Sequence, residues 1–208
     1  MENKTEGKKL KDLIGAGLVR GLHYGEYRSL MDQLAREGKT TGLEQSKLYS
    51  DFTKLNQQRM KRLDKTVKLE EEVRRKVAEI PNKMTWLVLT ESWCGDAAQT
   101  IPVINQLALL NPNITLKLIL RDENLELMEH FLSNGTRSIP KLLALDAISS
   151  EVLWTWGPRP SEARKMANDY QKMHGQLTPE FKEDLQVWYN RNKGKNTVED
   201  LMELLFLE

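Results

Sequence analysis

A single cysteine, Cys94, is the residue of this 208-residue chain whose position most favours chemistry. It follows the apolar run Trp86–Thr90 and begins a helical pattern that extends to Leu110, so it lies where a buried strand gives way to a helix. The free N–H groups and the positive dipole end at a helix start stabilise a thiolate. Because the thiolate is the nucleophilic form, we expect Cys94 to be ionised and accessible near neutral pH. The alternative is an inert buried cysteine that behaves as a small apolar residue.

The composition excludes several classes of protein. One cysteine allows neither a disulfide framework nor a multi-cysteine metal cluster within the chain, and three scattered histidines lack the spacing of metal ligands. A net charge of +1 gives no general attraction to nucleic acid or to acidic membranes. The first apolar patch, Leu13–Val19, is too short for a membrane helix, and we expect a cytoplasmic protein that does not bind membranes.

The surroundings of Cys94 resemble the thioredoxin-like family at four places. Trp93–Ala97 is similar to the family's Trp-Cys-Gly-Pro-Cys element, and Pro102 matches the proline that kinks the active-site helix. Arg137–Pro140 resembles the Arg-x-Ile-Pro segment, whose proline is cis and lies beside the cysteine, and Gly157 stands where the family has a glycine before its last helix. The resemblance covers about residues 83–170 and is closest to a bacterial subgroup with a Trp-Cys-Gly-Asp motif and a helical N-terminal extension.

This resemblance, together with alternating strand and helix patterns, implies a fold of the α/β class. We expect a thioredoxin-like core with a mixed central sheet flanked by helices, extended by helices at both ends. The predicted organisation is an N-terminal helical extension (1–82), a thioredoxin-like domain (83–173) and a C-terminal helical tail (174–208).

The periodicity within these regions predicts individual elements. Glycines such as Gly15 and Gly17 argue against a long early helix, and a short helix should end at Gly38. The run Leu43–Ile80, which has neither glycine nor proline, predicts a helix with a break near Asp64–Thr66. The strands are expected at 86–90, 114–120, 141–145 and 152–156, and the later helices at 94–110, 124–132 (stopped by Asn134-Gly135), 161–173 (capped by Ser161), from Thr178 and from Thr197.

Two departures from the family pattern restrict the chemistry. Ala97 replaces the second cysteine of the motif, and Val88 replaces the buried acid that the family has six residues before the first cysteine. No intramolecular disulfide can form, so Cys94 would attack a disulfide and an external thiol would release it. We therefore expect monothiol exchange in cell redox homeostasis, with a disulfide-containing protein or a small-molecule thiol as partner and no cofactor. An iron–sulfur cluster, as in some monothiol glutaredoxins, is disfavoured because Asp96 fits that pattern poorly.

The neighbouring residues receive supporting roles. The resemblance implies that the backbone of Ile139, before a cis Pro140, pairs with an extended substrate peptide, and that Trp93, Ile139 and Gly157 line a shallow groove. Gly95 and Asp96 complete the motif.

Two acids near Cys94 are open to more than one interpretation. Asp96 is either a first-turn acid that favours the helix dipole or a proton relay, and its charge would raise the pKa of Cys94. Glu91 is a weaker candidate base and is expected to be solvated. Arg159, in a stiff Gly-Pro-Arg-Pro loop, could contact an anionic group.

A second hypothesis is a redox-inert binding module whose helical flanks form the interface, including a possible homodimer through these extensions. The missing resolving cysteine and the missing buried acid motivate it. A third concerns residues 54–76, which hold nine basic and four acidic side chains. We interpret this stretch as a solvated helix face rather than an RNA-binding surface, and no nucleic-acid partner is expected.

Overall fold

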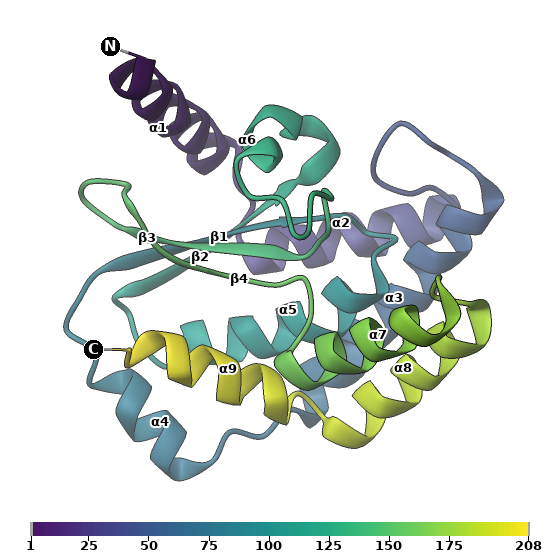
Figure 1. Ribbon diagram of the computed structural model, residues 1–208. Helices are drawn as coiled ribbons and strands as arrows, with labels where there is room; N and C mark the ends of the chain where they lie inside the picture. Colours follow the sequence, from purple (N-terminus) through teal and green to yellow (C-terminus); the bar gives the residue numbers. More distant parts are fainter. Residues whose placement is uncertain (1, 208) are drawn as a thin grey trace.

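The protein is built on a four-stranded mixed sheet with strand order β2-β1-β3-β4 (Figure 1). The computed structural model describes residues 2–207, with side chains from Gly7 onward. Strands β1 (Met84–Thr90) and β2 (Ile114–Leu120) are parallel, whereas β3 (Lys141–Asp146) is antiparallel to β1 and β4 (Val152–Trp156) is antiparallel to β3. The predicted mixed sheet and the four predicted strands are confirmed.

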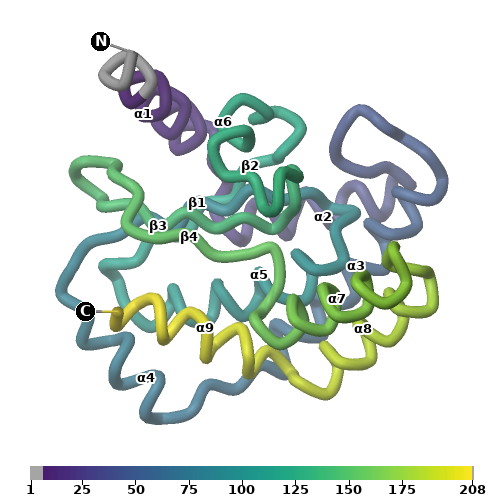
Figure 2. Tube along the Cα trace, viewed as in Figure 1, coloured from purple at the N-terminus to yellow at the C-terminus, as the bar shows by residue number. Residues whose placement is uncertain are grey.

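Helices cover both faces of this sheet and extend well beyond it (Figures 1 and 2). Within the described residues they are α1 (Glu2–Arg20), α2 (Tyr24–Glu37), α3 (Lys47–Thr66), α4 (Glu71–Ala78), α5 (Gly95–Ala108), α6 (Leu125–Glu129), α7 (Ser161–His174), α8 (Pro179–Asn192) and α9 (Lys195–Leu205), with a 3₁₀ turn at Arg121–Glu123.

The βαβ unit β1-α5-β2 positions the site. Parallel strands require a crossover, and α5 provides it, starting directly after Cys94 at the carboxyl end of β1. Helices α3 and α9 pack against α5 on one face of the sheet, while α1 packs against α6 and β2 on the other (Figure 1). Cys94 therefore lies at the junction between the sheet and the helical layer contributed by both chain ends.

The early glycines do not prevent a long helix, so that expectation was wrong. Helix α1 has 19 residues and contains Gly15 and Gly17. A Cβ at Gly17 would lie 3.2 Å from the side chain of Ile119 and 3.4 Å from that of Leu87. The glycine therefore serves close packing of α1 on the sheet, which outweighs its poor helix propensity.

Most other boundaries agree with the sequence patterns. Helix α2 ends at Gly38 with φ +66, and the break after α3 falls at Thr66. Helix α6 ends at Glu129, earlier than predicted, and the turn expected at Asn134-Gly135 is present at Ser133–Thr136, where both residues have positive φ. Ser161 is the first residue of α7 rather than its cap, and its hydroxyl donates to Asp200 Oδ1 at 2.6 Å.

The buried apolar residues form two clusters. The larger one includes the sheet, α5 and Leu201 of α9. The smaller one lies between α7 and α8 and consists of Ala163, Ala167, Phe181, Leu185 and Tyr189 with partly buried neighbours. The hairpin of α7 and α8 thus has a core of its own, beside the core that holds Cys94.

Across residues 2–207, the structure contains no helix with both the length and the apolar character needed to cross a bilayer.

Candidate functional site

Cys94 is the N-cap residue of α5, and two backbone groups define the position of its sulfur. Sγ accepts from the Ala97 N–H at 3.4 Å and donates to the Ile139 carbonyl oxygen at 3.3 Å. The first contact comes from the helix start, where N–H groups lack helical partners. The second joins α5 to the segment before β3, so two regions 45 residues apart meet at one sulfur atom.

The expectation of an ionised, accessible thiolate is contradicted. Cys94 is only 8% exposed and belongs to the main core. Burial, together with the nearby Asp96 carboxylate, raises the pKa of the thiol from 9.0 to about 12. The backbone N–H groups at the helix start and the Arg159 charge oppose this increase without overcoming it. Desolvation of a charged form outweighs the dipole of one helix, so the thiol is protonated at neutral pH in this closed arrangement.

Asp96, in the first turn of α5, is held by side chains from the C-terminal part of the chain. Its Oδ2 forms a 2.8 Å ion pair with Nε of Arg159, and its Oδ1 accepts from the Tyr189 hydroxyl at 3.0 Å. Burial raises the pKa of Asp96, while the Arg159 charge and the Tyr189 hydroxyl oppose that increase. The anionic group that Arg159 contacts is therefore internal, and Asp96 links the helix start to α8.

Trp93 and Gly95 flank the cysteine and are covered in different ways. The Trp93 ring lies 5.1 Å from the Tyr49 ring of α3, and the Arg121 guanidinium lies 5.0 Å from its centroid. A Cβ at Gly95 would lie 3.3 Å from Arg59 Nη1 and 3.5 Å from Gln186 Nε2. Side chains of α3 and α8 thus meet over Gly95, and α3 also covers Trp93.

The segment before β3 meets the start of the last helical region closely. The Ile139–Pro140 peptide bond is cis, and Ile139 is buried. At Gly157, with φ +115, a Cβ would lie 2.1 Å from the Pro140 carbonyl oxygen, so only glycine fits there. The structure thus brings Gly157 against Pro140 and Ile139 against Cys94, and the substrate groove along them stays a prediction.

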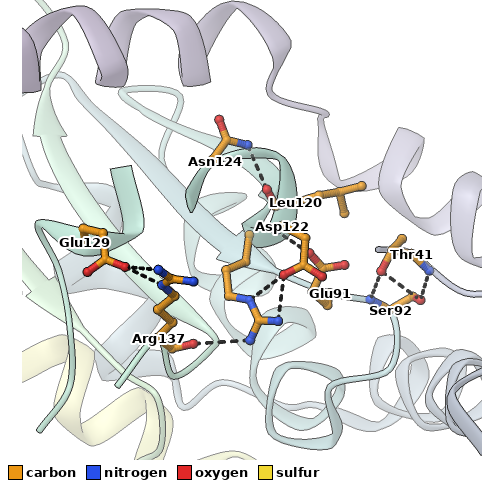
Figure 3. A network of polar contacts seen from close by, with 9 residues as sticks. Thr41, Glu91, Ser92, Leu120, Asp122, Asn124, Glu129 and Arg137 are labelled. Carbon is orange, nitrogen blue, oxygen red and sulfur yellow. Dashed lines mark hydrogen bonds and ion pairs between the residues drawn. The ribbon is translucent and has the colours of Figure 1, made fainter. Parts of the chain in front are cut away.

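The loop between β1 and Cys94 is held by a buried polar network (Figure 3). Ser92 N donates to Thr41 Oγ1 at 2.8 Å, and Thr41 N donates back to Ser92 Oγ at 2.9 Å. From α3, Thr53 Oγ1 lies 2.7 Å from Ser92 Oγ, and Asn56 Nδ2 donates to the Ser92 carbonyl at 2.9 Å. The backbone immediately before Cys94 is therefore fixed by α3 and the loop that precedes it.

Glu91 is not solvated, which corrects the expectation for this candidate base. It is buried, and its Oε1 accepts from the Asp122 N–H at 2.9 Å (Figure 3). Burial raises the pKa of its carboxyl group. The carbonyl of Glu91 accepts from the Cys94 N–H at 3.1 Å, so its backbone supports the cysteine.

Sequence reasoning missed the side chains of α3 and α8 that surround the motif. Tyr189 lies four residues after Leu185 and eight after Phe181, so its spacing indicates only one more apolar position of α8. No pattern in the sequence indicates the hydrogen bond that its hydroxyl donates to Asp96. Arg62 of the basic stretch donates to Asn190 at 2.7 Å, and Arg59 donates to Asn56 at 2.9 Å, so these charges serve internal contacts. Within the part of the chain that the structure describes, no three metal-ligating side chains converge on one point.

A cysteine at the start of the first crossover helix, facing the residue before a proline that precedes the antiparallel hairpin β3-β4, defines a thioredoxin-like protein with a one-cysteine site. A family model described as thioredoxin, Thioredoxin_9, matches residues 42–173, and the chain belongs to this family. The match reaches beyond the predicted core into α3, in agreement with the packing of that helix on the site.

Two solved structures share the fold. A protein of unknown function, PA1234 from Pseudomonas aeruginosa, is 16% identical, with a TM-score of 0.62 over 89% of this chain and 92% of that one. An HIV epitope scaffold is 17% identical, with a TM-score of 0.56 over 88% of this chain and 98% of the other. No curated protein sequence matches the chain significantly.

Proposed function

We propose that this protein is a cytoplasmic monothiol thiol–disulfide exchange protein in which Cys94 is the nucleophile. The position of Sγ, at the start of α5 and 3.3 Å from the Ile139 carbonyl, carries the proposal. A disulfide that approaches along Ile139 would be attacked by Cys94, its leaving sulfur would take the proton of the Cys94 thiol, and a mixed disulfide would form. A second thiol would then attack this mixed disulfide, return Cys94 to the thiol and leave as the new disulfide.

Exchange requires the closed arrangement to open. In that arrangement the thiol is protonated and covered, and the thiolate is the reactive form. The hairpin of α7 and α8 is the element best suited to move, because it has its own apolar core and contacts the α5 region through polar groups. Displacement would admit water to Cys94 and Asp96 and so lower the pKa of the thiol toward its ordinary value.

The experiment is the reaction of the full-length protein with a small disulfide, followed by intact mass measurement. We expect one adduct, located at Cys94, that a second thiol removes and that Cys94→Ser abolishes. In parallel, the alkylation rate of Cys94 should keep rising above pH 9 instead of levelling near pH 8.5. No adduct over hours at millimolar disulfide would refute the proposal.

A second candidate function, a redox-inert binding module, is favoured by the burial of Cys94 and its raised pKa. In this case α3 offers an interface, because Leu48, Phe52 and Leu55 are exposed along one side of that helix. A homodimer through this helical extension is then expected. Sedimentation of the wild type and of Phe52→Glu separates the candidates, since a dimer that Phe52→Glu dissociates and Cys94→Ser leaves intact supports binding without redox chemistry.

A further inference from the structure

The outer edge of β2 has a backbone position that no strand of the chain pairs with. Strand β2 is at one end of the sheet, and Leu22, between α1 and α2, bonds to its free side at Leu118 through two backbone hydrogen bonds of 2.8 Å. Because backbone groups alternate in direction along a strand, the N–H and C=O of Leu116 also point away from β1. Among the described residues, neither of these two groups has a hydrogen-bond partner.

A cavity lies at this position. Continued antiparallel pairing from Leu22 would bring residue 24 opposite Leu116, but Tyr24 is the first residue of α2, so a helix begins where the strand would continue. The cavity has a volume of about 360 Å³ and lies between residues 23–25 of α2 and its N-cap, residues 114–116 of β2, and Asn105, Ala108 and Leu109 at the end of α5. It therefore adjoins the unpaired backbone of Leu116.

Asn105 brings a second pair of hydrogen-bonding groups to the cavity. The residue is 9% exposed and lines the cavity, and its side-chain amide forms no hydrogen bond within the part of the chain that the structure describes. An amide buried without a partner is costly. An asparagine here, beside the Leu116 backbone, indicates a ligand that carries both hydrogen-bond donors and acceptors, as a peptide does.

The end of α5 adds an apolar contact at the rim. Leu109, the C-cap residue of α5, is 71% exposed. Gly17 of α1 faces Ile119, so the side chain of Leu116 points to the opposite face of the sheet, where α5 packs. A residue paired with Leu116 would place its side chain on that same face, against Ala108 and Leu109.

The charge around the cavity favours an uncharged ligand. None of the residues that line it is an aspartate, glutamate, lysine or arginine. The Glu26 carboxylate, which accepts from the His23 N–H at 2.7 Å, lies at the start of α2 and would repel an anion. Since Leu22 already occupies the edge at Leu118, only a short segment fits beside Leu116.

We propose that this cavity binds a short, uncharged, extended segment of a partner protein, which adds to the edge of β2 opposite Leu116 and packs one apolar side chain against Leu109. The site is separate from the thiol, because Asn105 lies eleven residues after Cys94, about 16 Å along α5. The inference therefore does not depend on exchange at Cys94.

The first experiment titrates the isotope-labelled full-length protein with acetyl-Thr-Leu-Thr-amide and follows its backbone amide resonances. We expect the Leu116 amide proton to move downfield and to saturate, because it gains an acceptor. The analogue with an N-methyl group on its leucine cannot donate to the Leu116 carbonyl and should bind about fivefold more weakly. Acetyl-Asp-Leu-Asp-amide should also bind more weakly, because Glu26 repels it. A Leu116 resonance that does not move at millimolar acetyl-Thr-Leu-Thr-amide would overturn the proposal.

Variants separate binding from a structural role. Asn105→Leu removes an amide without partners, so the urea midpoint of unfolding should stay or rise while binding of acetyl-Thr-Leu-Thr-amide weakens about fivefold. Leu109→Ser should weaken binding, whereas the matched control Leu125→Ser, at a 40% exposed position of α6, should not. Cys94→Ser should bind as the wild type does. A lower urea midpoint for Asn105→Leu with unchanged binding would assign the amide a structural role and contradict the proposal.

Sedimentation tests whether a second copy of the chain uses this edge instead. We expect Leu109→Ser to leave the sedimentation of the protein unchanged. A wild-type dimer that Leu109→Ser dissociates would assign the edge of β2 to self-association and overturn the assignment to a partner segment.

Discussion

Two helices cover Cys94, α3 from the N-terminal part of the chain and α8 from the C-terminal part, and their contacts with the site differ. On the N-terminal side, Thr53 and Asn56 of α3 reach Ser92 through hydrogen bonds among buried atoms. On the C-terminal side, α8 reaches α5 through Tyr189 to Asp96 and Gln186 to Gln99, and in each contact one partner, Asp96 or Gln186, keeps some exposure to solvent. The α3 side continues the main core, whereas the α8 side adds a separate core to its surface.

This difference indicates which cover belongs to the fold and which can move. Buried polar groups that lose their partners retain the full cost of desolvation, so we expect the α3 side to open only with global unfolding. Partly buried polar contacts can exchange partners with water, so their loss costs less. Local opening is drawn from such low-stability regions, and the α7–α8 hairpin satisfies this description.

The largest effect is expected from the α3 side. Asn56→Ala removes the donor to the Ser92 carbonyl and leaves Arg59 without its Asn56 acceptor. We expect a loss of about 2–3 kcal/mol in the free energy of unfolding, measured with urea. The matched control is Asn190→Ala on α8, which removes the exposed acceptor of Arg62 and should cost less than about 0.5 kcal/mol. Equal losses for the two variants would contradict the comparison.

A smaller effect on the free energy of unfolding is expected from the buried thiol of Cys94. The pKa of Cys94 is raised from 9.0 to about 12, so the folded protein keeps a proton that the unfolded chain releases above pH 9. The stabilisation is complete below pH 9 and is lost as the pH rises toward 12, at up to about 1.4 kcal/mol per pH unit. Burial also raises the pKa of Tyr24, Tyr27 and Tyr189, so the release of their protons in the unfolded chain lowers the free energy of unfolding over the same pH range.

Cys94→Ala isolates the contribution of the thiol, because the tyrosines are retained in both proteins. Urea unfolding between pH 8 and pH 11 should show a steeper decline for the wild type than for the variant. Parallel declines would mean that the thiol is not buried in solution as it is in this structure.

The sequence predicted the sheet and the meeting of Cys94, Ile139, Pro140 and Gly157, because these depend on local patterns and on a motif with fixed spacing. Its error at Cys94 has a physical origin. The helix start is a local property that the sequence displays, whereas desolvation of the sulfur depends on segments far away in the chain. No pattern around Tyr189 or Gln186 predicts that their side chains contact residues 95 and 96.

Helix α1 also shows that local sequence patterns do not capture tertiary contacts, because it forms although its glycines disfavour a helix. Local propensity argued against a helix through Gly15 and Gly17, and close packing against Ile119 made the glycine at 17 useful. Where tertiary contacts decide, propensity is only a weak guide.

The smallest change in stability is expected at the contact between α8 and Asp96. Tyr189→Phe keeps the ring in the hairpin core and removes only the hydroxyl that Asp96 accepts at 3.0 Å. The free energy of unfolding should fall by no more than about 1 kcal/mol, while alkylation of Cys94 at pH 8 should accelerate about fivefold if this contact helps to close the site.

Tyr170→Phe is the control, since the Tyr170 hydroxyl lies 2.9 Å from Thr178 Oγ1 within the same hairpin and does not touch α5. It should cost similar stability and leave the alkylation rate unchanged. The same acceleration in both variants would show that general loosening of the hairpin, rather than its contact with Asp96, controls access to the sulfur. No acceleration in either would place the barrier on the α3 side, where opening requires the loss of the Ser92 network.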